Sequence, residues 1–385
     1  MIDKINLNLN TLQKALKKAL DYESVINLSA EINSPIAPPI SASISITSRC
    51  NSDCIYCSFR SSLSKNKIDI SNEKIKRIID DLSIIGVRVI TFTGGEPLLR
   101  TDLSELCKYA NSKKMTVHVT TNGLLLTNEI AYELYSSGVS NIIISLDSFD
   151  ERIYNKHRGV SFKKVSNAID SLLYFANLDH KNYGVVTYVV SRLNFLELPS
   201  FVKSLSKYGN KKLLVNIQPY HKPPVLETIP SKTLENATKE ELKIYKSLLD
   251  AEKDLSPQES DREKLEKSIY EIINLKQKGF PINNSVFYLK SIPNFLISNQ
   301  LPEGLNCKAG YSGVYIQENL NMLPCWRLPS IGNLDQYNLT ELWFSERYSE
   351  VRSKMLNHDC PKCMFLCHNE TGWYSWYNIF YKQDD

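Results

Sequence analysis

The sequence lacks the features of membrane-spanning, secreted and nucleic-acid-binding proteins. No apolar run approaches the about 18 residues that a membrane-spanning helix needs, and the N-terminal stretch MIDKINLNLN has no apolar core of a signal peptide. The formal net charge is only +4, and no cluster of Lys and Arg is interleaved with aromatic residues. We therefore expect a cytoplasmic protein with neither a membrane nor a nucleic acid as its partner.

A disulfide framework is also missing. Nine cysteines are too few to staple a chain of 385 residues, and an odd number cannot pair completely. The hydrophobic share of 42% and the charged share of 23% are ordinary for a globular protein, whose length suits one large domain and a smaller one. Because the cysteines are clustered, they indicate metal binding in a reducing compartment.

The first cysteine cluster lies in the stretch RCNSDCIYCSFR, residues 49–60, which follows a strand-like segment at 40–47. Cys50, Cys54 and Cys57 have the spacing C-x3-C-x2-C, and the stretch contains no fourth cysteine. Iron–sulfur cubanes are normally held by four cysteines, so three local ligands would leave one iron open to an exchangeable ligand. An open site indicates catalysis. A zinc loop is the alternative, because a second pair of cysteines lies much later in the chain.

Strand-like and helix-like periodicities alternate through the first half of the chain. The expected strands span residues 40–47, 87–95, 116–123, 141–148, 183–191 and 212–220. The expected helices between them span residues 71–86, with Ser71 as N-cap and Gly86 at the end, and 102–112, 128–137, 162–176 and 195–208. Such alternation predicts an α/β fold whose parallel sheet is curled by right-handed crossovers, with helices outside.

Glycine and polar residues follow the expected strands at their carboxyl ends, where parallel α/β proteins bind ligands. The second strand ends in TGGEP, in which Gly94 and Gly95 allow a close approach of the backbone. Two other residues favour a structural role. Cys107 lies on the apolar side of its helix, and His118 in the middle of a strand is more often packed than catalytic.

The cysteine loop, with aromatic Tyr56 before its third cysteine, and TGGEP one strand later together resemble the radical S-adenosylmethionine (SAM) superfamily. The resemblance implies a partial (β/α)6 TIM-like barrel, a [4Fe–4S] cluster on Cys50, Cys54 and Cys57, and SAM on the open iron. It implies that residues 94–97 contact the SAM amino group and that the fourth strand faces the ribose. Arg158 would pair with the SAM carboxylate, a surface ion pair being the alternative. The expected cofactor-binding residues are Tyr56, Gly94, Gly95, Glu96, Pro97, Asn122, Ser145, Asp147, Arg158, Thr187 and Asn194.

A second cysteine cluster lies in the last hundred residues. An expected hairpin at 311–325 is bracketed by two cysteines, and the motifs IGNL and ELWFSERY precede a C-P-K-C knuckle. This pattern resembles the C-terminal SPASM or twitch extension of radical SAM enzymes. Because a full SPASM domain has more cysteines, we expect one auxiliary [4Fe–4S] cluster, with the choice of ligands open among Cys307, Cys325, Cys360, Cys363 and Cys367. The alternative is a zinc knuckle of the last three cysteines and His368.

Four segments are expected. Residues 1–39 hold an N-terminal helix at 10–27 and a linker, and residues 40–220 form the barrel. Residues 221–300 form a helical bridge, with helices at 238–252 and 257–279, and residues 301–385 form the small cysteine-rich hairpin-plus-helix domain.

The resemblance implies an enzyme that cleaves SAM reductively to a 5′-deoxyadenosyl radical, which abstracts a hydrogen atom from the substrate. An auxiliary cluster favours oxidation, crosslinking or epimerisation of a ribosomally made peptide, with flavodoxin or ferredoxin as the reducing partner. Against a peptide, the region before the first strand shows no winged-helix domain for a leader. The alternatives are radical chemistry on a sugar, nucleoside or tetrapyrrole, and a non-catalytic zinc-binding module.

Overall fold

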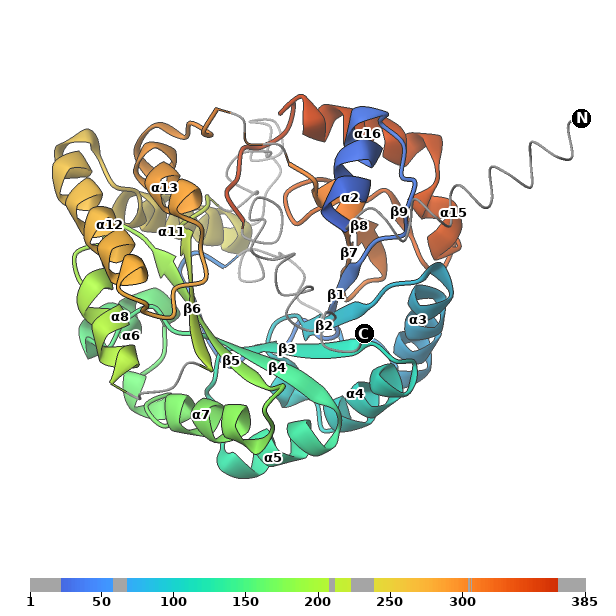
Figure 1. Ribbon diagram of the computed structural model, residues 1–385, viewed down its shortest axis with the longest axis horizontal. Coiled ribbons are helices and arrows are strands. Elements are labelled where there is room, and N and C mark those ends of the chain that lie inside the picture. The colour runs from blue at the N-terminus through green and yellow to red at the C-terminus, as the bar shows by residue number, and fades with distance from the viewer. Residues whose placement is uncertain are drawn as a thin grey trace, which may run out of the picture.

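The computed structural model describes residues 22–57, 68–207, 212–222, 239–303, 305 and 307–365. Six parallel strands follow one another in the sheet in chain order, which confirms the predicted partial barrel (Figure 1). They are β1 (Ser41–Ser45), β2 (Val89–Thr93), β3 (Thr116–Thr121), β4 (Val139–Ser145), β5 (Tyr183–Val190) and β6 (Leu213–Pro219).

Helices cover the outer face of this sheet as an arc (Figure 1). They are α3 (Asn72–Ile85), α4 (Leu103–Ser112), α5 (Asn128–Ser136), α6 (Glu151–Arg158), α7 (Ala168–Leu178) and α8 (Leu198–Ser206), with short 3-10 turns η1 (Pro97–Leu99) and η2 (Phe162–Lys164). Ser71 caps α3 by accepting a hydrogen bond from the backbone of Lys74, and Gly86 ends the helix at φ 101°. Both helix ends were predicted from the sequence.

The two faces of the strands differ in polarity, because successive side chains point to opposite sides. On the helix side, Ile44, Phe92 and Val119 lie in register on neighbouring strands and are fully buried in the main core. The opposite face, toward the inside of the barrel, carries Ser43, Thr91, His118 and Asn141 in the next register position. The barrel interior is therefore polar, whereas the wall behind it is apolar.

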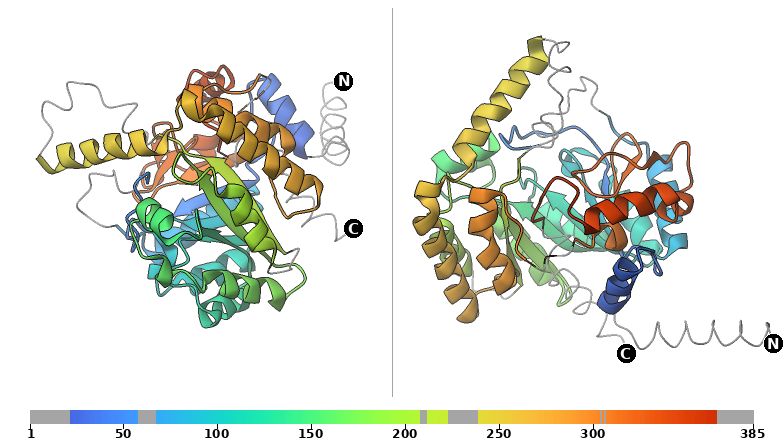
Figure 2. Two further views of the ribbon diagram at one scale, coloured as in Figure 1. Left: turned by 90° about the vertical axis from the view of Figure 1, so that its left-hand side faces the viewer. Right: turned by 90° about the horizontal axis from the view of Figure 1, so that it is seen from above.

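The bridge after the barrel covers the edge of β6. It contains α11 (Lys239–Leu255), η3 (Glu259–Asp261), α12 (Arg262–Gln277) and α13 (Val286–Ser298). The Val215 N–H donates to the Pro281 carbonyl at 2.8 Å, and the Asn283 N–H donates to the Val215 carbonyl at 2.9 Å. The edge strand thus finds backbone partners outside the barrel, beside α12 and α13 (Figures 1 and 2).

The C-terminal region extends the same sheet on its other side. β7 (Gly313–Ile316) runs parallel to β1, and β8 (Asn321–Leu323) and β9 (Gly332–Asn333) continue antiparallel, which gives the strand order β6-β5-β4-β3-β2-β1-β7-β8-β9. The predicted hairpin is present as β7 and β8. Helices α14 (Ala309–Ser312), α15 (Leu339–Trp343) and α16 (Glu346–Leu356) surround it.

At the other terminus, the first described helix is α2 (Tyr22–Glu31), which contacts α14. The helix predicted for residues 10–27 lies mostly outside the described residues, and the observed helix ends four residues later than predicted. Within the described ranges, no helix is long and apolar enough to cross a membrane.

Candidate functional site: two groups of cysteines on one sheet

The cysteine loop after β1 is held against the end of α6. The Asp53 N–H donates to the Arg158 carbonyl at 3.1 Å, and the Ser52 hydroxyl donates to the same oxygen at 2.8 Å. Gly159, at φ 65°, ends the helix here, and a Cβ on it would lie 2.4 Å from the Asp53 carbonyl oxygen. Only glycine therefore lets the loop pack this closely on the helix.

Three polar groups face the sulfur atoms of this loop. The Ser52 Oγ lies 3.4 Å from Cys54 Sγ, and Arg158 Nη1 lies 3.8 Å from the same sulfur. Asn122 Nδ2, from the end of β3, lies 3.8 Å from Cys50 Sγ. Cys54 is buried, and Cys50 and Cys57 are half-buried. Arg158 and Asn122, as donors directed at the sulfur atoms of Cys54 and Cys50, fit the iron–sulfur cluster that the spacing predicts.

The glycines of TGGEP allow two segments of the backbone to approach each other closely. Gly94 lies at φ 136°, where a Cβ would be 2.4 Å from the Thr47 carbonyl oxygen, and a Cβ on Gly95 would be 2.1 Å from the Arg49 carbonyl oxygen. The Gly95 and Glu96 N–H groups donate to these same two carbonyls, each at 2.7 Å. The close approach is therefore to the backbone that leads into the cysteine loop. Contact of residues 94–97 with the SAM amino group stays a prediction.

The Glu96 carboxylate joins the ends of β2 and β3. It is fully buried and accepts hydrogen bonds from Leu98 N at 3.0 Å, Thr121 Oγ1 at 2.7 Å and Asn122 N at 2.7 Å. Burial raises its pKa, although these three donors act in the opposite direction. Pro97 follows at the start of η1. Glu96 thus fixes the position of Asn122, which in turn faces Cys50.

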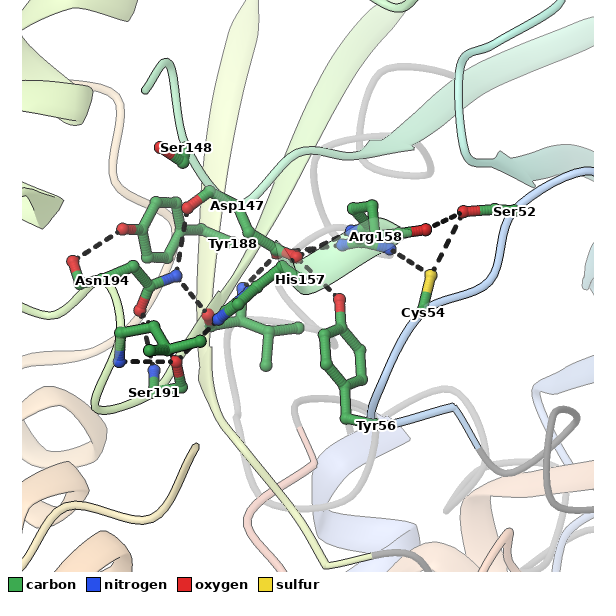
Figure 3. A network of polar contacts seen from close by, with 12 residues as sticks. Ser52, Cys54, Tyr56, Asp147, Ser148, His157, Arg158, Tyr188, Ser191 and Asn194 are labelled. Carbon is green, nitrogen blue, oxygen red and sulfur yellow. Dashed lines mark hydrogen bonds and ion pairs between the residues drawn. The ribbon is translucent and has the colours of Figure 1, made fainter. Parts of the chain in front are cut away.

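Asp147, just after β4, lies at the centre of a buried polar network (Figure 3). Its carboxylate is 2.7 Å from Arg158 Nε and 2.9 Å from Arg158 Nη2, and it accepts hydrogen bonds from Tyr56 Oη at 2.7 Å and Val189 N at 2.9 Å. His157 Nδ1 lies 3.3 Å away. Burial alone would raise the pKa of Asp147, but the Arg158 charge and the hydrogen bonds hold it well below its usual value.

Two expectations change with this network. The surface ion pair proposed as the alternative for Arg158 is wrong, because its side chain is only 7% exposed and that of Asp147 is 0% exposed. Asp147 already receives donors on both carboxylate oxygens, which argues against a contact with the ribose. Ser145 is the remaining fourth-strand candidate and lies beside Thr187 of β5 in the sheet register. For Ser145, Thr187 and Arg158, contact with SAM stays a prediction.

Asn194 closes the turn after β5. Its amide donates to the carbonyl oxygens of Asp147 at 3.0 Å and Val189 at 2.9 Å, and its oxygen accepts from Ser191 N at 2.8 Å. The side chain is buried with its hydrogen-bonding groups engaged by protein partners. These contacts favour a structural role over the predicted contact with SAM.

Sequence reasoning missed the contribution of His157, whereas it named Ser191 as a polar candidate after the fifth strand. Both are fully buried, and His157 Nε2 lies 2.8 Å from Ser191 Oγ while its other ring nitrogen faces Asp147. The signal that could have found His157 is the short helix α6, where Asp150 caps two backbone N–H groups at the start and His157 lies two residues before the terminating Gly159.

The second group of cysteines gathers beside the β7–β8 hairpin. Burial raises the pKa of Cys307, and nearby Cys363, Cys325 and Cys360 raise it further. Burial, Cys363 and Cys360 raise the pKa of Cys325 to about 12. Four of the five predicted ligands are thus near one another, whereas Cys367 and His368 lie outside the described residues. Among the described residues, no group of three or more His, Cys, Asp or Glu side chains is placed so that it could hold a single metal ion.

Arg352 of α16 supports this region and was not predicted. Its fully buried guanidinium donates to the carbonyl oxygens of Gly310 and Trp343, each at 2.7 Å, and lies 3.7 Å from the centre of the Tyr348 ring. Gly310 is three residues after Cys307, so Arg352 ties that cysteine segment to α15 and α16.

The two residues expected to be structural are buried. Cys107 is inaccessible to solvent, and burial raises its pKa strongly. His118 is 4% exposed, and burial lowers its pKa from 6.5 to about 4. Neither belongs to the polar contacts around the cysteine loop described above.

Comparison with known proteins gives two family matches. Residues 44–189 match the model of the radical SAM superfamily, and residues 307–364 match that of an iron–sulfur cluster-binding domain, SPASM. Among curated proteins, the chain is 40% identical to Fe-coproporphyrin III synthase of Methanosarcina barkeri over 115 residues, 30% of this chain and 29% of that protein. It is 31% identical to mycofactocin maturase MftC of Mycolicibacterium smegmatis over 182 residues, 47% of this chain and 45% of that protein.

The chain therefore spans less than half the length of these two curated relatives. Among solved structures, Streptococcus suis SuiB bound to precursor peptide SuiA superposes with a TM-score of 0.61 at 16% identity. That alignment covers 91% of this chain and 79% of the other, and it shows a shared fold.

Proposed function

Because this chain belongs to the radical SAM superfamily and carries a SPASM domain, we propose that it oxidatively modifies, crosslinks or epimerises a ribosomally made peptide. The carrying observation is the loop of three cysteines at the carboxyl ends of parallel strands, with a second group of cysteines beside the β7–β8 hairpin of the same sheet. The radical SAM domain implies a [4Fe–4S] cluster and SAM, and the SPASM domain implies an auxiliary iron–sulfur cluster.

When bound, the cluster supplies an electron to SAM, and SAM supplies the 5′-deoxyadenosyl radical that takes a hydrogen atom from the substrate. The protein must then hold and orient these groups. Cys50, Cys54 and Cys57 would hold the cluster, and Asn122 fixes one side of the loop through its contact with Cys50. The polar residues inside the barrel provide hydrogen-bonding groups for a ligand, while the apolar outer face keeps water away from the strands.

A peptide substrate is supported by the structural comparison, because SuiB, which shares the fold, is bound to a precursor peptide. An auxiliary cluster within electron-transfer distance could accept the electron that a substrate radical loses, which suits a net oxidation. We propose flavodoxin or ferredoxin as the reducing partner and the cytoplasm as the compartment.

Small-molecule chemistry is the second candidate. Fe-coproporphyrin III synthase shows the higher identity, 40%, although over only 115 residues. A tetrapyrrole or another small molecule is therefore the alternative substrate. Incubation with the peptide encoded by a short reading frame beside the gene tests the choice. A SAM-dependent loss of hydrogen mass from that peptide or, for epimerisation, a D-residue found after its hydrolysis supports the peptide, and a peptide changed in neither way with a converted tetrapyrrole overturns it.

Anaerobic reconstitution tests the chemistry itself. The protein is loaded with iron and sulfide, given dithionite and SAM, and assayed for 5′-deoxyadenosine and iron. We expect about eight irons per chain, equivalent to two cubanes, and release of 5′-deoxyadenosine. Replacing Cys50, Cys54 and Cys57 together by Ala should abolish that release and leave about four irons. Cys107→Ala is the control. Release by the triple variant would refute the assignment.

A second variant tests the auxiliary cluster. Replacing Cys307 and Cys325 by Ser should reduce the iron content by about half and block product formation. Some 5′-deoxyadenosine should still be released, because the first cluster is intact. An unchanged iron content would show that these two thiols bind no cluster.

A further inference from the structure

The buried ion pair between Asp147 and Arg158 fixes the direction of the guanidinium. Asp147 binds Nε at 2.7 Å and Nη2 at 2.9 Å, which together form one side of the planar group. The third nitrogen, Nη1, then points away from Asp147 and lies 3.8 Å from Cys54 Sγ (Figure 3). The orientation of Arg158 toward the cysteine loop is thus set by the carboxylate behind it.

That carboxylate is itself held from several elements. Val189 N of β5 donates to it at 2.9 Å, and Tyr56 of the cysteine loop donates through its hydroxyl at 2.7 Å. His157 lies between Asp147 and Ser191, 3.3 Å from the first and 2.8 Å from the second. Asp147, His157 and Ser191 are all 0% exposed. Water therefore cannot replace a missing hydrogen-bond partner. Ser191 restricts the orientation of the His157 ring, and Asp147 restricts that of the Arg158 guanidinium.

The position of Arg158 has an electrostatic consequence for a cluster on the cysteine loop. Its side chain is 7% exposed, so the charge is only weakly screened by solvent. Hydrogen bonds to the sulfur ligands of an iron–sulfur cluster, and local charge, are among the main determinants of its reduction potential. A positive group beside Cys54 Sγ stabilises the reduced cluster, which carries one more electron than the oxidised one.

We propose that Arg158 tunes the cluster that cleaves SAM, raising its reduction potential through Cys54, and that His157 and Ser191 are positioning residues acting through Asp147 and Arg158. The proposal rests on the proposed function, because it requires a cluster on Cys50, Cys54 and Cys57. The electron comes from an external donor, dithionite in the assay, and reduces the cluster in a one-electron step. This role differs from contact with the SAM carboxylate.

The test is the midpoint potential of this cluster, measured without SAM by a redox titration followed by electron paramagnetic resonance. The signal of the auxiliary cluster is recorded in the variant lacking Cys50, Cys54 and Cys57 and is subtracted. We expect Arg158→Met to shift the midpoint to a more negative potential, Arg158→Lys to shift it less, and Ser191→Ala to shift it slightly in the same direction. Arg152→Met is the control, because Arg152 lies on the same helix with its side chain 91% exposed.

The affinity for SAM is measured on the same proteins. An unchanged midpoint in Arg158→Met, Arg158→Lys and Ser191→Ala, with weaker SAM binding in the Arg158 variants, would overturn the proposal in favour of the carboxylate contact. If Arg158→Met does not retain its cluster, the midpoint potentials of the milder variants Arg158→Lys and Ser191→Ala test the proposal. Absence of any cluster from the unmodified protein after reconstitution would instead refute the proposed function, so the two failures are distinguishable.

Discussion

Glu96 is a fully buried carboxylate whose three hydrogen-bond donors come from two different strand ends. Glu96→Ala leaves Thr121 Oγ1 and the N–H groups of Leu98 and Asn122 without this acceptor. We expect the free energy of unfolding to fall by about 3 kcal/mol, because buried donors that lose a charged partner are costly. Chemical unfolding of the anaerobic protein measures this loss in the absence of SAM.

Thr121→Val is the matched comparison, since it keeps the shape of the side chain and removes one donor to Glu96, together with the acceptor of the Gly123 N–H. It should cost about 1 kcal/mol. If Glu96→Ala weakens SAM binding but leaves the stability unchanged, Glu96 is a SAM contact as first expected, and its structural role is minor.

His118 gives the stability a pH dependence. Burial lowers its pKa from 6.5 to about 4, so between these values the unfolded chain binds more protons than the folded one. The contribution of His118 is therefore present above pH 6.5 and is lost as the pH falls toward 4. Between pH 7.5 and 5.5 this amounts to about 1.4 kcal/mol. His118→Gln should remove that part of the pH slope in unfolding titrations, whereas His180→Gln, on an exposed side chain, should not.

For single residues, the sequence predicts which residue types make up the site better than it predicts which residues contact one another. The spacing of the cysteines and the adjacent glycines are local patterns, and the structure places both where they were expected. The partners of Asp147 are not local, because Tyr56 is 91 positions away along the chain. Only the folded barrel shows that Asp147 and Arg158 satisfy each other, which leaves less of Asp147 available for a ligand.

Among the helices, α3 allows a direct test of the residues that the sequence predicts to begin and end a helix. Ser71 accepts a hydrogen bond from the Lys74 N–H and so satisfies one of the free donors at the helix start. Ser71→Ala should lower the free energy of unfolding by about 1 kcal/mol. Ser83→Ala, inside the same helix, should leave stability unchanged or slightly higher, because alanine has the greater helix propensity. Equal effects of the two substitutions would contradict the capping role.

The six barrel strands were predicted close to their observed bounds, but α6 and α13 were missed. α6 is only eight residues long, ERIYNKHR, so its periodicity gives little signal. α13 contains Pro293, which in sequence reasoning ends a helix because its ring excludes a backbone N–H. In the structure, α13 packs on α12 and β6, and tertiary packing overrides that local cost.

For the whole molecule, the decisive feature is the pairing of β1 with β7. The sequence predicts separate segments at 40–220 and 301–385, but the sheet runs through both, with Ser41 in register with Gly313 and Ile44 in register with Ile316. Pattern reasoning identifies each strand but not its neighbour when the two lie at opposite ends of the chain. The same sheet therefore carries the cysteine loop after β1 and the cysteines around the β7–β8 hairpin.

Val314→Pro tests whether the two cysteine groups depend on each other. Val314 is fully buried in β7, which has strands on both sides, so proline removes a backbone hydrogen bond from the sheet. We expect iron at both sites to fall together, as measured by iron per chain and by 5′-deoxyadenosine release. Val314→Ala is the control, because it keeps the backbone donor. Loss of the C-terminal iron alone, with normal 5′-deoxyadenosine release, would show that the two regions fold independently.

The β1–β7 pairing also orders events during synthesis on the ribosome. β1 emerges early, yet its neighbour on one side is translated only after β2 to β6 and the bridge helices. Until then one edge of β1 has unpaired N–H and carbonyl groups, and such late, long-range pairing is slow. The strand that leads into the cysteine loop thus gains its last neighbour late in synthesis. We therefore expect iron to be delivered to the completed chain. We also expect the incomplete barrel to bind chaperones.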